Sequence, residues 1–244
     1  MALSAHIDQA ERFVYVLDHD AGLRSTLSEP DRSRARQHAV AAIADLPSGT
    51  WDPAEGPSAE VGLLVLRGLL IREVQVPEAR CGELIGPGTL LRPLDDTAAG
   101  ASMRHDVVWH VVEPARLALL DQHFLRVAAH WPALTTALVA RATERAHDLA
   151  VMMSIHSLKR VDARLLAFFW HLADRHGKVT SDGVLIPLPL THRQLALVVG
   201  AQRPSVTSAL GQLADRGVVH RDAAGRWVLA GDQADELAPL GGVA

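Results

Sequence analysis

The sequence predicts an α+β protein in which a small β-roll comes first, one long helix follows, and two short helices with a hairpin come last. Three observations support this fold class. Between about residues 46 and 120, short apolar runs alternate with Gly and Pro, which is typical of a β-roll of the double-stranded β-helix or jelly-roll type. From Pro132 to His156 the chain has neither Gly nor a further Pro, which favours one long helix. From Thr191 to Val219, two amphipathic patterns flank Gly200, which indicates a pair of short helices.

The composition limits the classes of function. The 244 residues are 48% hydrophobic and 21% charged, a balance that supports a sizeable core. The net charge is −4, so binding to nucleic acid would need a local basic patch. The single cysteine, Cys81, excludes an internal disulfide and a metal site built from several cysteines of one chain. The first residues do not resemble a signal peptide and no run reaches the roughly 18 apolar residues of a membrane span. We therefore expect a cytoplasmic protein that makes no membrane contact.

Changes in sequence texture divide the chain into five segments. We expect an N-terminal helical segment over residues 1–45, the β-roll over 46–130, the long helix over 131–157, the short helices with their hairpin over 158–231, and a flexible tail over 232–244. Ser28 or Asp31 would cap a helix in the first segment. In the roll, we expect Arg67–Gly68 to separate a pair of β-rich runs and Glu113–Pro114 to form a turn between two strands.

The long helix over residues 131–157 is expected to pair with a second copy of the chain as a dimerisation helix. Six of its positions recur at spacings of 4, 3, 4, 3 and 4 residues, the pattern of a narrow coiled-coil seam. They are Leu138, Ala142, Arg145, Leu149, Met152 and His156. Because Arg145 and His156 interrupt the seam, packing of the helix against its own domain is the alternative.

The stretch THRQLALVVGAQRPSVTSALGQLADRGVV carries the signals of a helix-turn-helix. Thr191 and Gln194 have the spacing of a capping box at the start of the first helix. Gly200 can take the positive φ that ends this helix, and Pro204 fits the first turn of the next one. The apolar positions of the second helix fall on one face, with Val206, Leu210 and Leu213.

The outer faces of this segment predict contact with duplex DNA. The second helix presents a polar and nearly acid-free set of residues, Arg203, Ser205, Thr207, Ser208 and Gln212. Arg203 can reach a phosphate or a guanine edge, and Arg221 and Arg226 lie on the hairpin that follows. From Thr191 to Leu229 the chain has five arginines and two acidic residues, a local basic balance typical of a DNA-reading module. The alternative is a helical hairpin with an ordinary solvated face.

The order of these parts resembles the Crp/Fnr family of bacterial transcription regulators. The resemblance covers Leu46 to Gly231, and its most specific portion is LTHRQLALVVGAQRPSVTSALGQLADRGVV. LPSGTWDP and LLVLRGLLIREVQV resemble the early strands of the family's effector domain, and IGPGTLL resembles its glycine-containing turn. The resemblance implies a cyclic-nucleotide-binding-like effector domain followed by a winged helix-turn-helix domain. It also implies a homodimer that binds a palindromic operator with the recognition helix, residues 203–214, in the major groove. RNA polymerase is a further candidate partner.

The resemblance implies roles for individual residues. Family members read base edges from the places of Arg203, Pro204 and Ser208, and they contact phosphates or cap helices from those of Thr191, Arg193, Gln202 and Ser205. Thr207, Arg221 and Arg226 complete the candidate DNA-binding set. Many relatives carry Glu at the place of Pro204 and Arg at that of Ser208, so an operator other than the best-known one of the family is expected.

The effector cassette departs from the family pattern. Relatives that bind cyclic nucleotides begin this cassette with Gly-Glu and end it with Arg and a small residue, but here Arg92–Pro93 stand at its start and Arg104 is followed by His105. The pair Asp95–Asp96 would repel a phosphate. Cyclic AMP is therefore not the expected effector. Arg92 and Arg104 remain the candidate contacts for an unidentified small molecule, unless sensing has been lost.

We expect neither a bound metal or other cofactor nor an enzymatic activity. The thirteen histidines include no tight ligand pattern such as H-x-H or H-E-x-x-H. Cys81 has only Arg80 beside it, which is weak evidence for a redox role. The competing interpretation is a cupin-like β-barrel that binds a small molecule or metal as an enzyme, for which His110 and Glu113 are the available ligands.

Overall fold

The computed structural model describes residues 13–56, 59–93 and 105–231. The predictions for Arg104, for Asp95–Asp96 and for the tail over 232–244 lie outside these residues. Two compact units divide the chain, residues 1–78 with 83–148 and residues 79–82 with 149–244. Among the described helices, none has the length and apolar character needed to cross a membrane.

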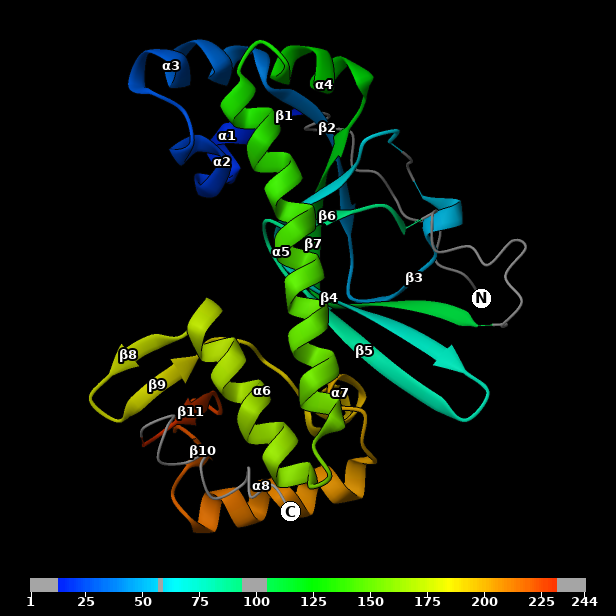
Figure 1. Cartoon of the computed structure of the whole chain (residues 1–244), viewed down its shortest axis with the longest axis vertical. Helices are drawn as coiled ribbons and strands as arrows, with labels where there is room; N and C mark the ends of the chain where they lie inside the picture. Colours follow the sequence, from blue (N-terminus) through cyan, green and yellow to red (C-terminus); the bar gives the residue numbers. More distant parts are fainter. Residues whose placement is uncertain (1–12, 57–58, 94–104, 232–244) are drawn as a thin grey trace. The chain divides into compact units, whose positions relative to one another are not determined.

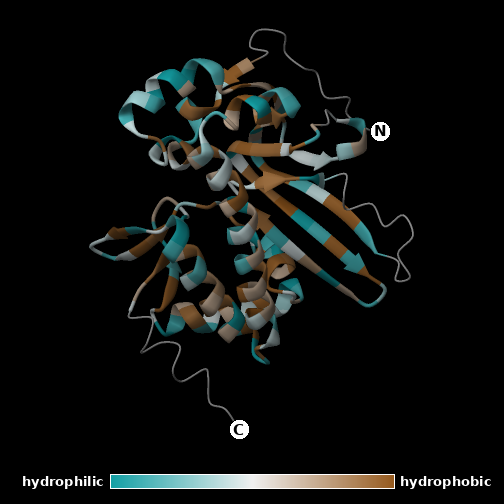
Figure 2. Ribbon diagram, turned by 45° about the horizontal axis from the view of Figure 1, so that its top comes forward, coloured by the Kyte–Doolittle hydropathy of each residue, from teal (hydrophilic) through white to brown (hydrophobic). Residues whose placement is uncertain are grey.

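A seven-stranded sheet forms the framework of the first unit (Figure 1). Its strands are β1 (Phe13–Tyr15), β2 (Val40–Leu46), β3 (Gly49–Trp51), β4 (Gly62–Val76), β5 (Ala79–Ile85), β6 (Leu90–Leu91) and β7 (Asp106–Leu120). The order is β1-β2-β7-β4-β5, with β3 paired to β7 and β6 paired to β4. Apolar and polar residues follow one another along the long strands, as the brown and teal bands of Figure 2 show. One face of the sheet buries a core in which the rings of Trp51 and Trp109 meet edge to face at 5.5 Å.

The strands β4 and β7 run unbroken through both places where the sequence suggested interruptions. The break expected at Arg67–Gly68 and the turn expected at Glu113–Pro114 were wrong, because each strand continues through its position. Instead, the register shifts around Gly68, which has φ +91° and lies against Pro114 and Ala115 of β7. A Cβ on Gly68 would lie 2.5 Å from the Cα of Ala115. The Gly and the Pro therefore mark one shared bulge, because a bulge tolerates both the missing amide and the positive φ.

Three short helices, α1 (Val16–His19), α2 (Ala21–Ser25) and α3 (Glu29–His38), lie in the N-terminal segment. The Ser28 hydroxyl accepts a hydrogen bond from the Asp31 amide and caps α3. The segment is not wholly helical as predicted, because it also contains β1 and β2. The run VAAIADL of β2 suits a helix or a strand by its apolar pattern, and its pairing with β7 decides the outcome.

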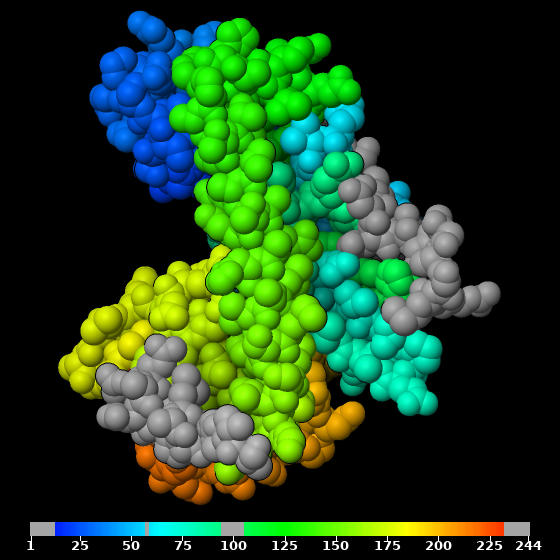
Figure 3. Space-filling model, in the orientation of Figure 1, coloured from blue at the N-terminus to red at the C-terminus, as the bar shows by residue number. Residues whose placement is uncertain are grey.

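Helix α5 (Pro132–Ser157) follows the short α4 (Gln122–Ala128). Leu134 and Leu138 of α5 are buried in a second core cluster, with Phe124 of α4 and Leu17 and Leu23 of the N-terminal helices. Another face of α5 is open to solvent along the helix (Figure 3). The helix therefore packs against its own domain on one side, which was the alternative to the seam prediction.

The second unit is built around α6 (Val161–His176), whose buried face includes Leu165, Phe168 and Phe169. After it come β8 (Lys178–Thr180), β9 (Gly183–Ile186), α7 (His192–Val198), α8 (Arg203–Asp215), β10 (Val219–Arg221) and β11 (Trp227–Leu229). The four strands form a small sheet in the order β10-β11-β9-β8. The α+β class is thus confirmed: a sheet domain, a long helix, and a helix-turn-helix with a small wing sheet.

Candidate nucleic-acid interface

Helix α7 begins with the predicted capping box. The Thr191 hydroxyl accepts a hydrogen bond from the Gln194 amide at 3.3 Å, and the Gln194 carboxamide oxygen accepts one from the Thr191 amide at 2.8 Å. These two bonds satisfy amides that have no partner inside the helix. The start of α7 is therefore fixed by residues only three positions apart.

The turn between α7 and α8 is a Schellman motif at Gly200. Its φ is +62°, the Ala201 amide donates to the Ala196 carbonyl at 2.9 Å, and the Gly200 amide donates to the Leu197 carbonyl at 3.4 Å. Only glycine adopts this conformation without strain. The turn then leads into α8 within three residues, with Pro204 in the first turn of that helix.

Helix α8 presents the polar face that the sequence predicted. Its buried residues are Val206, Ala209, Leu210 and Leu213. Its exposed residues include all the candidate base and phosphate contacts in its first two turns, Arg203, Pro204, Ser205, Thr207 and Ser208, with Gln202 before them. Thr191 and Arg193 are exposed at the start of α7. No acidic residue lies on α8 before Asp215, so the first three turns of this helix offer nothing that would repel a phosphate.

The two arginines of the hairpin are less available than the sequence suggested. Arg221 donates to the carbonyl oxygens of Gly225 and Leu190, and its guanidinium lies 4.0 Å from the centre of the Trp227 ring. Arg226 forms an ion pair with Asp222 at 2.6 Å. Both side chains are exposed, but their donors already have partners within the hairpin or beside it. The side chain of Arg203, by contrast, is exposed at the start of α8.

His192 is a residue of this surface that the sequence reasoning missed. Its Nδ1 lies 3.1 Å from the Thr207 hydroxyl oxygen, and the Thr207 hydroxyl donates to the Arg203 carbonyl at 3.1 Å. The Thr207 oxygen then accepts from His192, which places the imidazole proton on Nδ1. The ring of His192 also stacks on Trp227 at 6.0 Å. Its position between Thr191 and Arg193, in the first turn of α7, was the signal available in the sequence.

The stability of this surface should depend on pH through His192. Burial, together with the positive charges of Arg221 and Arg203, lowers the pKa of His192 below its ordinary value of 6.5. Well above pH 6.5 the ring is neutral in both folded and unfolded chains. As the pH falls below 6.5, the unfolded chain takes up the proton first, so the free energy of unfolding should fall until the pKa of the folded state is passed.

Thermal melts of the wild type and of His192→Gln between about pH 7.5 and about pH 5 measure this dependence. The melting temperature of the wild type, relative to that of the variant at the same pH, should fall toward acid, because glutamine carries no proton to gain. Other histidines contribute equally to both proteins and cancel in the difference. Parallel curves for the two proteins would contradict the assignment.

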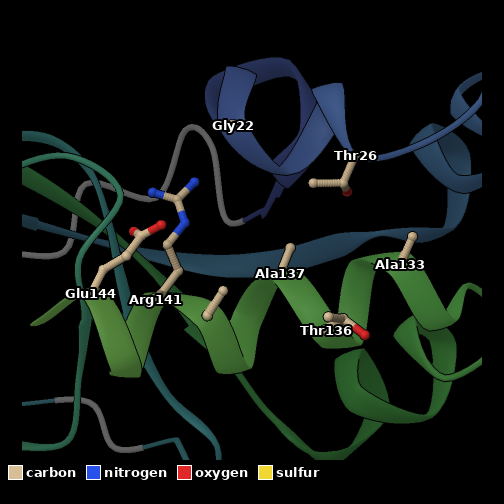
Figure 4. A pocket seen from close by; sticks show the side chains of 8 residues that line it. Gly22, Thr26, Ala133, Thr136, Ala137, Arg141 and Glu144 are labelled. Atoms are coloured by element: carbon tan, nitrogen blue, oxygen red, sulfur yellow. The ribbon is translucent and has the colours of Figure 1, made fainter. Parts of the chain in front are cut away.

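Of the two candidate effector residues, Arg92 and Arg104, only Arg92 lies within the part of the chain that the structure describes. Arg92 is exposed and the adjacent Pro93 is buried. A groove of about 580 Å³ lies elsewhere in the first unit, between α2 and α5, with Thr26 on one side and small side chains of α5 along the other (Figure 4). Arg141 and Glu144 lie at one end of this groove, and Arg92 does not line it.

Among the described residues, no group of three His, Cys, Asp or Glu side chains is arranged to hold a metal. His110 instead bonds Glu73 at 2.8 Å.

Comparison with known proteins agrees with this architecture. Residues 163–231 match the Crp-like helix-turn-helix domain. The chain is 26% identical over 119 residues to the global nitrogen regulator of Synechococcus elongatus, covering 48% of this chain and 54% of that protein. It is 33% identical over 84 residues to the regulatory protein CysR of the same organism, covering 33% and 38%. The alignments with the curated relatives thus span about a quarter to about half of the length of those proteins.

A solved structure matches the chain over nearly its whole length. A structure of a CooA mutant from Carboxydothermus hydrogenoformans superposes with a TM-score of 0.62 at 17% identity and covers 98% of both chains. The curated relatives named here are both described as regulators. Residues 163–231 thus carry a Crp-like helix-turn-helix domain, and the chain shares the fold of this solved structure, with a sheet domain, a long helix and a helix-turn-helix.

Proposed function

We propose that this protein is a DNA-binding transcription regulator that inserts α8 into the major groove of duplex DNA. The observation that carries the proposal is the exposed face of α8, with Arg203 at its start and no acidic residue before Asp215, on a domain of the Crp-like type. An arginine in this place can form two hydrogen bonds with a guanine edge. The small neighbours Ser205 and Ser208 let the helix approach the groove closely.

Selection of binding sites from random duplexes, with the purified full-length chain, tests the proposal. We expect an enriched sequence made of two inverted half-sites, about 34 Å apart along the DNA axis. The affinity for it should fall steeply with salt, because phosphate contacts release counterions. Recovery of no preferred sequence, with and without added cell extract, would refute the proposed function.

We propose further that the protein acts as a homodimer joined through α5. Leu138 of the expected seam is buried in its own domain, Arg145 forms an ion pair with Glu83 at 2.6 Å, and His156 bonds the Val198 carbonyl. A row that keeps only Ala142 and Leu149 of the expected seam is exposed on α5, at spacings of 3, 4, 3 and 4 residues: Val139, Ala142, Ala146, Leu149 and Met153. Met153 is 73% exposed and Val139 64%. Three large apolar side chains with two alanines at this spacing fit a second copy of the same helix.

Changing Met153 to Glu should weaken the dimer by about tenfold to a hundredfold. Two carboxylates would meet across the twofold axis in place of apolar contact. Analytical ultracentrifugation over a concentration series measures the dissociation constant. The matched control is Val179→Glu, since Val179 is also apolar and is 89% exposed on β8. Equal dissociation constants for the two variants would contradict the α5 interface.

The regulatory input is proposed to be something other than cyclic AMP. Arg92–Pro93 occupy the start of the cassette, and Pro93 is buried where the resemblance places the glutamate of the Gly-Glu pair. Thermal shift with cyclic AMP should therefore show no stabilisation at concentrations up to 100 times a typical dissociation constant, at which a ligand adds about 2.7 kcal/mol.

A further inference from the structure

The last carbonyl group of α7 and the two carbonyls that follow it in the turn receive hydrogen bonds from two other helices. Nε2 of His156, in the last turn of α5, lies 2.7 Å from the Val198 carbonyl oxygen. The guanidinium of Arg164, in the first turn of α6, lies 3.0 Å from the Gly200 carbonyl oxygen and 3.5 Å from that of Val199. Three consecutive carbonyls at the turn of the helix-turn-helix are therefore held by side chains from α5 and α6.

These carbonyls cannot be satisfied within α7 itself. The final carbonyls of a helix have no amide ahead of them. The Schellman motif at Gly200 uses the carbonyls of Ala196 and Leu197, which precede the three in question. The negative end of the helix dipole also favours a cation at this position, and Arg164 supplies one.

Arg164 binds the connection between α5 and α6 as well. Its Nε donates to the Leu158 carbonyl at 2.6 Å, so one guanidinium joins that connection to the turn before α8. The His156 ring also lies 3.8 Å from the place that a Cβ on Gly200 would occupy. The two side chains thus fix the turn from one side, only three residues before Arg203.

We propose that Arg164 and His156 are positioning residues for DNA recognition: they hold the α7–α8 turn, and through it the angle and depth at which α8 meets base edges. This inference rests on the proposed function of α8. Neither side chain needs to touch DNA. Their loss should impair the reading of bases, which demands accurate placement, more than the sequence-independent attraction to phosphates.

The test compares the affinity for the selected operator with that for a random duplex of equal length. Arg164→Gln should reduce the operator affinity by about tenfold or more, since it removes charged hydrogen bonds. The affinity for random duplex and the slope of log affinity against log salt should stay unchanged, because the number of phosphate contacts is the same. Arg34→Gln removes the same charge from an exposed position of α3 in the other unit and should change neither affinity.

A second pair of variants distinguishes a loss of positioning from a general loss of folding. The carboxamide of His156→Gln can still donate to the Val198 carbonyl, whereas His156→Leu cannot. The Gln variant should keep the operator preference and the Leu variant should lose about tenfold of it, with both proteins melting cooperatively. An unchanged preference in Arg164→Gln and His156→Leu would overturn the inference. So would equal losses of operator and random-duplex affinity together with a lowered melting temperature, which indicate a structural role alone. If the wild type shows no operator preference, the proposed function itself fails.

Discussion

Replacing Arg203 with alanine should weaken operator binding by about 1–3 kcal/mol per half-site and relax the preference at one base pair. Arg203 is exposed at the first position of α8, where it can form a bidentate contact that alanine cannot replace. Its neighbours on the hairpin, Arg221 and Arg226, already have partners and cannot compensate. Quantitative gel shift with the selected operator, and with operators changed at single base pairs, measures both effects.

The control for this variant is Arg34→Ala, which removes one exposed positive charge from the other unit. It should leave the affinity and the base preference as they are. A uniform fall across all sequences with Arg203→Ala, together with a smaller salt slope, would mean that Arg203 contacts only phosphate. No change at all would contradict the placement of α8 in the groove.

Replacing Arg141 with alanine should lower the free energy of unfolding by about 3–5 kcal/mol. Its guanidinium bonds Asp20 at 2.7 Å and the Gly88 carbonyl at 3.1 Å, and so connects α5 to the start of α2 and to the glycine turn after β5. The Asp20 side chain is only 6% exposed. Without Arg141 this buried carboxylate would lose its cation, and one of its oxygens already has no hydrogen-bond partner. Chemical denaturation followed by circular dichroism measures the loss.

Arg36→Ala provides a matched comparison, because Arg36 forms a similar ion pair with Asp18 at the surface. Both side chains of that pair are well exposed, so water replaces the lost contact and the loss should be far smaller. Combining Arg141→Ala with Asp20→Asn should recover some of the stability by removing the uncompensated charge. If the losses from Arg141→Ala and Arg36→Ala are equal, the buried pair does not hold α5 in place.

The helix-turn-helix could be predicted from the sequence because its signals act over short distances. The capping box joins Thr191 to Gln194, and Gly200 ends α7 through bonds to residues at most five positions away. The exposed face of α8 follows from the positions of Val206, Leu210 and Leu213 alone. Local chemistry of this kind is nearly independent of the rest of the chain.

Other features depended on strand register and on contacts between distant residues. Gly68 and Pro114 suggested two turns, and only the pairing of β4 with β7 shows that they share one bulge. The row of residues on α5 was chosen by spacing, but spacing does not say which side of a helix its own domain covers. Arg221 lies over the Trp227 ring and donates a hydrogen bond to the Leu190 carbonyl, 31 positions away in the chain. No pattern in the sequence indicated these contacts.

By itself, the sequence determined where the helices of the DNA-reading segment begin and end and which of their residues stay in water, since caps, glycine and apolar period are local properties of a chain. Only the tertiary structure determined which charged and polar side chains have ion-pair or hydrogen-bond partners within the protein. It pairs Arg145 with Glu83, Arg141 with Asp20, and His192 with Thr207. The physical reason is that a side chain's availability depends on neighbours that folding brings to it, and these lie 15 to 121 positions away in the chain.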